Sequence, residues 1–313
     1  IDAIRLSIAA RSAGDPEIIH LVGTNALLFS PASKLLGSKG RIIRHIFTPF
    51  DAKDRAIAPV RRFANRFFID SYAFTTPRIG QWAKELSPRT KHYLIRPPIN
   101  CAYYKPNPTI QSRTSESSDG FQTILYMGPL LQTRFPYEMV LRALKRLVGR
   151  GMKLRLIVLT SPSRTSKELC DRVLSLARDL SIQEYLHLER IDLNEDERIE
   201  RYNQADTVIF PYVGPEPERL ADPPFGILEA MACGAIVLST DVLSVSEVLR
   251  DGVNGFLIKK ASVDDLASGL LGALGASEDT HLRMKARERI VEGFDYPIVA
   301  KEMIKSYDNL LDR

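Results

Sequence analysis

The sequence is poor in cysteine and has no long apolar segment. Its three cysteines, Cys101, Cys170 and Cys233, are far apart and lack the paired spacing of a zinc site or a disulfide framework. No apolar run approaches the ~18 residues that a membrane-spanning helix needs. Residues 1–13 form an amphipathic pattern without the basic and apolar regions of a secretory signal peptide. These absences predict a metal-free protein of the cytoplasm, where cysteines stay reduced.

The two halves of the chain differ in charge. Residues 1–108 contain 17 lysines and arginines but 7 aspartates and glutamates, a net charge of +10, whereas the remaining residues contain 26 and 31, a net charge of −5. This asymmetry indicates that the first half faces a polyanion or an anionic membrane surface, although a solvated basic face would give the same composition. The basic half contains no recognised nucleic-acid-binding module, so we expect no nucleic acid as partner.

Strand and helix patterns alternate along the 313 residues, a length above the ~250–300 at which a single core stops growing. The alternation predicts two α/β domains with parallel sheets and crossover helices. The polar stretch at 109–120 is the expected linker between a domain at 1–108 and a second domain that starts at 121. The expected strands are 18–22, 41–47, 70–76, 91–95, 123–127, 154–160, 185–188, 207–211, 235–239 and 256–258, and the expected helices are 27–36, 77–86, 137–148, 166–180, 196–204, 228–233 and 246–250.

The most informative segment is 222–241, in which prolines and a glycine precede a helix-forming run. This order places Gly226 at the start of a helix, where unpaired N–H groups and the helix dipole attract phosphate. Glu229 is then expected in the first turn, where a carboxylate can accept two hydrogen bonds from a ribose. The alternative is a glutamate that only complements the helix dipole.

This segment, together with 246–248 and 251–258, closely resembles the signature of the retaining GT-B glycosyltransferases of family 4. The resemblance continues through 124–128, 141–144 and 202–211, and it is looser in the first half, at 18–20, 97–100 and 104–106. It implies an α/β fold of the GT-B type, with two Rossmann-like domains facing across a cleft. The second of these, 121–293, would bind the nucleotide sugar, and a helix at 294–313 would return to the first domain.

The resemblance also implies an activity, namely retaining transfer of a sugar from a nucleotide-sugar donor to a glycan or lipid-linked acceptor, without cofactor or metal. By position, Glu229 would be the second acid of the paired-glutamate motif and would hold the donor ribose. Gly226 with its neighbours Phe225 and Ile227, and Gly128 after the first strand of the domain, would lie at the donor. Where the family has the first glutamate this chain has Ala221, so Asp222 or Glu218 would have to stand in.

The basic residues at the implied donor site also depart from the family pattern. Of the two cations that clamp the diphosphate, one position is Pro129 and the other is Arg134, which can still contact a phosphate. Arg190 lies in the segment 186–191, which corresponds to the base-recognition strand. The acidic run 192–197 could suggest a metal site, but a helix cap with an acidic first turn explains it.

Two histidines are expected near the cleft. His20 ends a strand where the family often has a histidine, and His45 lies about two residues before a second such place. Either residue could be a cleft residue of the catalytic site or a structural histidine.

The first domain departs most from the family, because the initial βαβ unit with its glycine-rich loop has no counterpart in the sequence. We therefore expect this chain to bind a nucleotide sugar but to transfer the sugar slowly or not at all. A noncatalytic nucleotide-sugar-binding partner subunit and a nucleotide-sugar epimerase of the same fold stay open as alternatives, which product analysis separates. The expected location is cytoplasmic, peripheral at the inner membrane face.

The basic helix that contains Arg61, Arg62 and Arg66 is predicted to favour anionic membranes. Phe63 and Phe67 are spaced i,i+4 on this helix and are expected to be core residues, so the arginines carry the test. Cosedimentation should show tighter binding to vesicles with anionic lipid than to neutral vesicles, and weaker binding as salt rises. Vesicle binding that ignores both lipid charge and salt would contradict the prediction.

Overall fold

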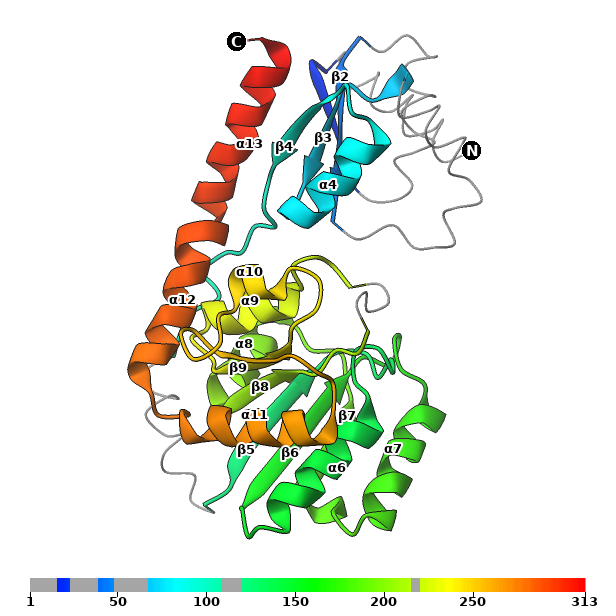
Figure 1. Ribbon diagram of the computed structural model, residues 1–313, viewed down its shortest axis with the longest axis vertical. Helices are drawn as coiled ribbons and strands as arrows, with labels where there is room; N and C mark the ends of the chain where they lie inside the picture. Colours follow the sequence, from blue (N-terminus) through cyan, green and yellow to red (C-terminus); the bar gives the residue numbers. More distant parts are fainter. Residues whose placement is uncertain (1–15, 23–38, 48–66, 108–119, 215–219, 313) are drawn as a thin grey trace. The chain divides into compact units, whose positions relative to one another are not determined.

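The computed structural model describes residues 16–22, 39–47, 67–107, 120–214 and 220–312. The chain divides into two compact units: unit 1 comprises Ile1–Pro98 and Tyr296–Arg313, and unit 2 comprises Ile99–Asp295. Figure 1 shows the helices and strands of both units. Residues 99–107, which the sequence analysis assigned to the first domain, belong to unit 2.

Some sequence predictions fall outside the described residues. These are the amphipathic pattern at 1–13, the helix expected at 27–36, the basic helix with its three arginines and Phe63, most of the expected linker, and Glu218. Phe67 is described, and its side chain is 62% exposed, so the prediction that it is a core residue is wrong. Within the described part of the chain, no helix is both long enough and apolar enough to cross a lipid bilayer.

Unit 1 contains a four-stranded parallel sheet in the order β1 (Ile18–Val22), β2 (Arg41–Ile46), β3 (Ser71–Phe74) and β4 (Lys91–Leu94). Successive side chains of a strand point to opposite faces of the sheet, so Ile42 and Ile43 belong to different hydrophobic clusters. Ile42 packs in the cluster that includes α4 (Pro77–Leu86), and Ile43 packs in the cluster that includes α13 (Tyr296–Leu311). α4 begins where Thr76 accepts a hydrogen bond from the Ile79 amide.

Unit 2 is built on a six-stranded parallel sheet in the order β10-β9-β8-β5-β6-β7. The first strand of the unit, β5, therefore lies in the middle, and the strand order reverses between β5 and β8 (Figure 1). This is the order of a doubly wound nucleotide-binding sheet. The strands are β5 (Gln122–Met127), β6 (Leu154–Thr160), β7 (Leu186–Arg190), β8 (Thr207–Phe210), β9 (Val237–Thr240) and β10 (Phe256–Ile258).

Helices cover both faces of this sheet, which explains why its strands read as continuous apolar runs. In β5, Ile124 and Tyr126 pack in one core cluster and Leu125 in the other. The helices that contribute mainly to the first cluster are α6 (Tyr137–Val148), α7 (Lys167–Asp179) and α11 (Val263–Gly275). Those that contribute mainly to the second are α8 (Glu195–Gln204), α9 (Phe225–Ala232), α10 (Val245–Val248) and α12 (Thr280–Phe294), and a 3-10 turn, η3 (Gln183–Tyr185), precedes β7.

The observed helix α9 differs from its prediction at the N-terminus. It begins at Phe225, three residues before the expected start, because Pro224 takes the cap position with extended backbone and its carbonyl accepts from the Ile227 amide. Glu229 is consequently the fifth residue of α9, so the expectation that it lies in the first turn is wrong. Glu229 therefore lies one turn further from the N-terminus of α9 than expected. At this position its side chain contacts Arg198 and Tyr202 of α8.

The segment 99–107 is fixed to unit 2 by hydrogen bonds along its length. The Ile99 amide donates to the Phe294 carbonyl at 2.7 Å, and the Asn107 amide donates to Oδ1 of Asn203 at 2.7 Å. In its middle, Arg287 of α12 donates to the carbonyls of Cys101 and Tyr104. Arg287 also donates to the carbonyl of Ala232, the last residue of α9. One guanidinium thus joins α12, α9 and the segment 99–107.

We predict that Arg287→Ala lowers the free energy of unfolding of unit 2 by about 2–4 kcal/mol, because three carbonyls lose their donor. Urea unfolding followed by circular dichroism measures the change. The sole tryptophan, Trp82, lies in unit 1, so its fluorescence reports that unit separately and should shift less. Glu292→Ala, on an exposed position of the same helix, is the control. An unchanged dichroism midpoint for Arg287→Ala would show that these bonds contribute nothing.

Candidate nucleotide-binding site

A cavity of about 580 Å³ in unit 2 lies at the carboxyl ends of four strands. Its wall includes residues that follow β5, β6 and β7, the end of β8, and the first turns of α9. Ligands of doubly wound sheets bind at the point where the strand order reverses, outside the carboxyl ends. The β5–β8 reversal places the cavity at that point.

Gly128 closes the turn after β5 and lines the cavity. Its amide donates to the Leu159 carbonyl at 3.0 Å, which holds the end of β5 to the end of β6. A Cβ atom at this position would lie 2.9 Å from the Tyr126 hydroxyl oxygen, closer than side chains pack. Glycine is therefore required here for packing, and the absent side chain leaves the cavity wall open.

The N-terminus of α9 forms another part of the wall, with Phe225 and Gly226. Pro224 offers no side-chain cap, and the Gly226 amide, as the second helical residue, has no intrahelical acceptor. A Cβ atom at Gly226 would lie 2.9 Å from Cε1 of Phe210, so the helix start can sit against β8 only with glycine there. Ile227 is fully buried in the core, and its amide already donates to Pro224, so it is not part of the wall.

Glu229 reaches the cavity from the second turn of α9. Its side chain is 12% exposed, and its Oε2 accepts a hydrogen bond from the Tyr202 hydroxyl at 3.1 Å. Nη1 of Arg198 lies 3.4 Å from each carboxylate oxygen. Burial raises the pKa of Glu229, while the Arg198 charge and the Tyr202 hydrogen bond act in the opposite direction.

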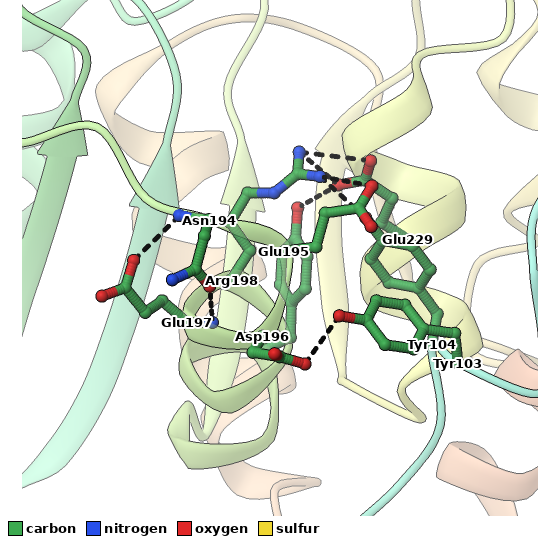
Figure 2. Close-up of polar contacts among 9 residues, drawn as sticks. Tyr103, Tyr104, Asn194, Glu195, Asp196, Glu197, Arg198 and Glu229 are labelled. Atoms are coloured by element: carbon green, nitrogen blue, oxygen red, sulfur yellow. Dashed lines mark hydrogen bonds and ion pairs between the residues drawn. The ribbon is translucent and has the colours of Figure 1, made fainter.

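Arg198 and Tyr104 are site residues that the sequence analysis did not identify. Figure 2 shows the Arg198 guanidinium directed at the Glu229 carboxylate. Nη2 of Arg198 donates to the Tyr104 hydroxyl at 2.7 Å, so the segment 99–107 touches the same cluster. The available signal was the i,i+4 spacing of Arg198 and Tyr202, which puts both on one face of α8.

Arg134 lies in the connection between β5 and α6, outside any helix, and lines the cavity. Its amide donates to the Leu131 carbonyl at 2.8 Å, which fixes the backbone of this turn. Burial raises the pKa of Tyr212, and the nearby Arg134 charge counteracts the increase. The structure therefore brings Arg134, Gly226 and Glu229 together on one cavity wall.

Asp222, proposed from the sequence as the stand-in for the first acid, is turned away from the cavity. Its side chain is 1% exposed, and its two oxygens accept from the amide and the hydroxyl of Ser244 at 2.9 and 3.1 Å. The neighbouring Ala221 lines the cavity instead. The geometry gives Asp222 a structural partner and no position at the donor site.

Arg190 is likewise engaged elsewhere. Its Nε donates to the Thr165 carbonyl at 3.0 Å and its Nη2 to the Pro162 carbonyl at 3.2 Å. Thr165 in turn bonds Thr160 at 2.5 Å and accepts from the Leu130 amide. Arg190 is not on the cavity wall, but it fixes the loop 160–165. Three residues of this loop, Ser161, Ser163 and Arg164, line the cavity.

The two predicted histidines lie together in unit 1. His20 Nε2 is 3.2 Å from His45 Nδ1, and His45 Nε2 is 3.0 Å from the Ile95 carbonyl. His20 Nδ1 is 2.6 Å from the Tyr307 hydroxyl. Burial, followed by the neighbouring His20, lowers the pKa of His45 to about 3, so His45 is neutral at physiological pH. The carbonyl acceptor then requires the proton of His45 on Nε2.

The acidic run 192–197 is a helix cap, as predicted. Asn194 accepts from the Glu197 amide and the Glu197 side chain accepts from the Asn194 amide, a capping box at the start of α8. Among the described residues, no group of three or more His, Cys, Asp or Glu side chains is arranged to hold a metal ion.

The strand order, the cavity at the strand reversal and the start of α9 on the cavity wall define unit 2 as a doubly wound α/β domain of the nucleotide-binding class. Residues 121–275 match the family described as glycosyl transferases group 1. Through this domain, the chain belongs to the group 1 glycosyltransferases, as the sequence resemblance indicated.

Relatives with assigned names agree with this family. The chain is 27% identical over 225 residues to the D-inositol 3-phosphate glycosyltransferase of Nocardia farcinica, a match that covers 70% of this chain and 47% of the relative. It is 28% identical over 195 residues to the phosphatidyl-myo-inositol mannosyltransferase of Mycolicibacterium smegmatis, which covers 60% of this chain and 45% of the relative. The chain thus spans about half the length of the curated relatives it matches.

A solved structure shows the same fold over nearly the whole chain. Anabaena HepE in complex with UDP matches with a TM-score of 0.80 at 14% identity, over 98% of this chain and 82% of that one. The fold class predicted from the sequence, two α/β domains of the GT-B type with parallel sheets, is therefore confirmed.

We predict that Asp222→Ala destabilises unit 2 by about 1.5–3 kcal/mol, because the Ser244 amide and hydroxyl lose a charged acceptor. Urea unfolding by circular dichroism measures this loss. Asp222→Asn keeps one acceptor and should cost less, and Asp241→Ala, at an exposed position after β9, is the control. Unchanged stability of Asp222→Ala together with weaker nucleotide binding would instead place Asp222 at the ligand.

Proposed function

We propose that this chain acts as a retaining glycosyltransferase that moves a sugar from a nucleotide-sugar donor to a glycan or lipid-linked acceptor. The observation that carries the proposal is the cavity wall of unit 2, which combines the Gly226 amide, the Arg134 guanidinium and the Glu229 carboxylate. Each group matches one part of a nucleoside diphosphate sugar. The names of the relatives, all sugar transferases, support the same reading.

The diphosphate is placed at Gly226 and Arg134 in this proposal. A helix N-terminus supplies an amide and the positive end of the helix dipole, and an arginine supplies two donors with a permanent charge. These groups stabilise negative charge on the leaving diphosphate, so the proposal needs neither a metal ion nor another cofactor. Glu229, ionised, accepts hydrogen bonds from the ribose hydroxyls.

The proposed reaction needs no protein nucleophile. The bond between the sugar carbon C1 and the diphosphate oxygen breaks, and a bond from C1 to the acceptor oxygen forms on the same face of the sugar. The departing diphosphate oxygen takes the proton of the acceptor hydroxyl, so atoms and charge balance. The protein acts by holding both substrates and by stabilising the charge on the leaving group.

The proposed acceptor is lipid-linked or part of a larger glycan, and the protein would act at an anionic membrane surface on the cytoplasmic side. The support is the net charge of +10 in residues 1–108, which attracts anionic lipid. One relative is named for phosphatidyl-myo-inositol, a membrane lipid. Cosedimentation with vesicles of defined charge tests this part of the proposal.

We predict that Arg134→Ala lowers the rate of sugar transfer by about 10²–10³ while weakening donor binding less, because its charge matters most as the leaving group becomes negative. The measurement is glycoside formation in the full-length protein, after a thermal-shift screen of nucleotide sugars has identified a donor. Arg150→Ala, an exposed arginine after α6, is the matched control.

The products decide between the alternatives. A glycoside with the donor configuration retained supports the proposal, whereas an epimerised nucleotide sugar would make the protein an epimerase. If the protein binds the donor but forms no product with any acceptor tested, it is a noncatalytic binding subunit. Equal losses of rate and affinity in Arg134→Ala would show that Arg134 binds substrate and transition state alike.

A further inference from the structure

We propose that Arg198, held by Tyr104, is a positioning residue that orients the Glu229 carboxylate and thereby makes the site select ribonucleotides over deoxyribonucleotides. The inference rests on the proposed function, because it assumes that a nucleoside diphosphate enters the cavity. It adds a role for Arg198, which lies outside the segments that carry the family resemblance, and for Tyr104, to which the resemblance assigns no role. Three features of the cluster support it.

The first feature is the unequal surroundings of the two Glu229 oxygens. Oε2 accepts from the Tyr202 hydroxyl at 3.1 Å and faces Arg198 Nη1 at 3.4 Å. Oε1 lies 3.4 Å from Arg198 Nη1, which is a long contact, and the Tyr104 hydroxyl also interacts with the carboxylate. A carboxylate oxygen accepts two hydrogen bonds, so Oε1 keeps capacity for hydroxyl donors from a ligand. The two contacts from α8 hold the carboxylate plane while one oxygen stays available to the cavity.

The second feature is that Arg198 is itself fixed. Its Nη2 donates to the Tyr104 hydroxyl at 2.7 Å, and Glu195 lies 3.7 Å away on the same helix. Burial lowers the pKa of Arg198, but the neighbouring Glu229 and the other groups outweigh it and raise the pKa. The guanidinium therefore stays charged and confined between Tyr104 and Glu229, as Figure 2 shows.

The third feature is the charge balance around Glu229. The groups that face it are Arg198, Tyr202 and Glu195 from α8, Tyr104 from the segment 99–107, and Cys233 at the end of α9. Of these, only Arg198 is positive, while burial and Glu195 raise the pKa of Glu229. A protonated carboxyl would offer a donor and a weaker acceptor to a ribose. Arg198 thus favours the ionised form that two hydroxyl donors require.

The sign of the pH dependence follows from these groups. Ribose recognition by ionised Glu229 is present above the folded pKa of Glu229 and is lost as the pH falls through it. Removal of Arg198 removes the charge that lowers this pKa, so the loss moves to higher pH. A 2′-deoxy ligand lacks one hydroxyl and should show a weaker pH dependence over the same range.

The test uses calorimetric titration of the chain with the four common ribonucleoside diphosphates and their 2′-deoxy forms, between about pH 5 and 8. For the ribonucleotide that binds, we expect a preference of about 10- to 100-fold over its deoxy form. In Arg198→Gln this preference should fall to within about threefold and its pH dependence should move to higher pH. Arg198→Lys should restore part of both, because it keeps the charge but not the fork of donors.

Two further variants separate positioning from folding. Tyr104→Phe removes one hydroxyl without removing the ring, and it should reduce the preference to an intermediate value. Arg201→Gln, on the same helix α8 but outside the cavity, should leave the preference unchanged. Circular dichroism confirms that each variant is folded before titration.

The outcomes distinguish the inference from the proposed function. No binding of any of the nucleotides to the unaltered chain would overturn the proposed function. Binding with a ribose preference that survives unchanged in Arg198→Gln would overturn the inference and leave the function in place. Loss of the preference in Arg198→Gln, with partial recovery in Arg198→Lys, supports it.

Discussion

The reversal of strand order at β5 is the constraint on which the site of unit 2 depends. β5 is the first strand of the unit in sequence. β6 and β7 follow on one side of it in the sheet, and β8, β9 and β10 lie on the other side. Crossover connections on either side lead away from the β5–β8 boundary, so the carboxyl ends of these strands border an open crevice. Gly128, Arg134 and the start of α9 all follow strands that end there.

Two glycines allow the backbone to pack closely around this crevice. Gly226 lets α9 begin against Phe210, and Gly128 lets β5 turn against Tyr126. Deeper in the crevice, Glu229 is largely buried, and a buried carboxylate loses the hydration that stabilises its charge. Arg198 and Tyr202 offset this loss, and Tyr104 anchors Arg198 from a segment 94 residues earlier in the chain. The packing of the sheet and the chemistry of the cavity are thus connected through α8 and α9.

The sequence predicted most of the fold because buried parallel strands and amphipathic helices have patterns of their own. The helices 77–86 and 137–148 have the predicted bounds, and each strand was found within a few residues. Gly226, Glu229 and Arg134 could be identified because their motif is local. Arg198 and Tyr104 could not, since their pairing with Glu229 depends on contacts 31 and 94 residues apart along the chain.

The errors have a similar cause. Asp222 is adjacent in sequence to the cavity residue Ala221, but the loop backbone turns its side chain to Ser244, and a sequence pattern does not give that direction. Arg190 lies two residues beyond the expected strand 185–188 and ends the observed strand β7, where its side chain donates to carbonyls of the loop 160–165. The helix start at Phe225 was missed because two prolines precede it, and only the structure shows that Pro224 acts as the cap.

The central claim is that the cavity at the β5–β8 reversal binds a nucleoside diphosphate through Gly226, Arg134 and Glu229. A crystal structure of the chain soaked with a nucleoside diphosphate tests it most directly. The account predicts phosphate density within hydrogen-bond distance of the Gly226 amide and the Arg134 guanidinium, and ribose hydroxyls within hydrogen-bond distance of Glu229. A nucleotide bound elsewhere, or bound in this cavity with its ribose away from Glu229, would contradict it.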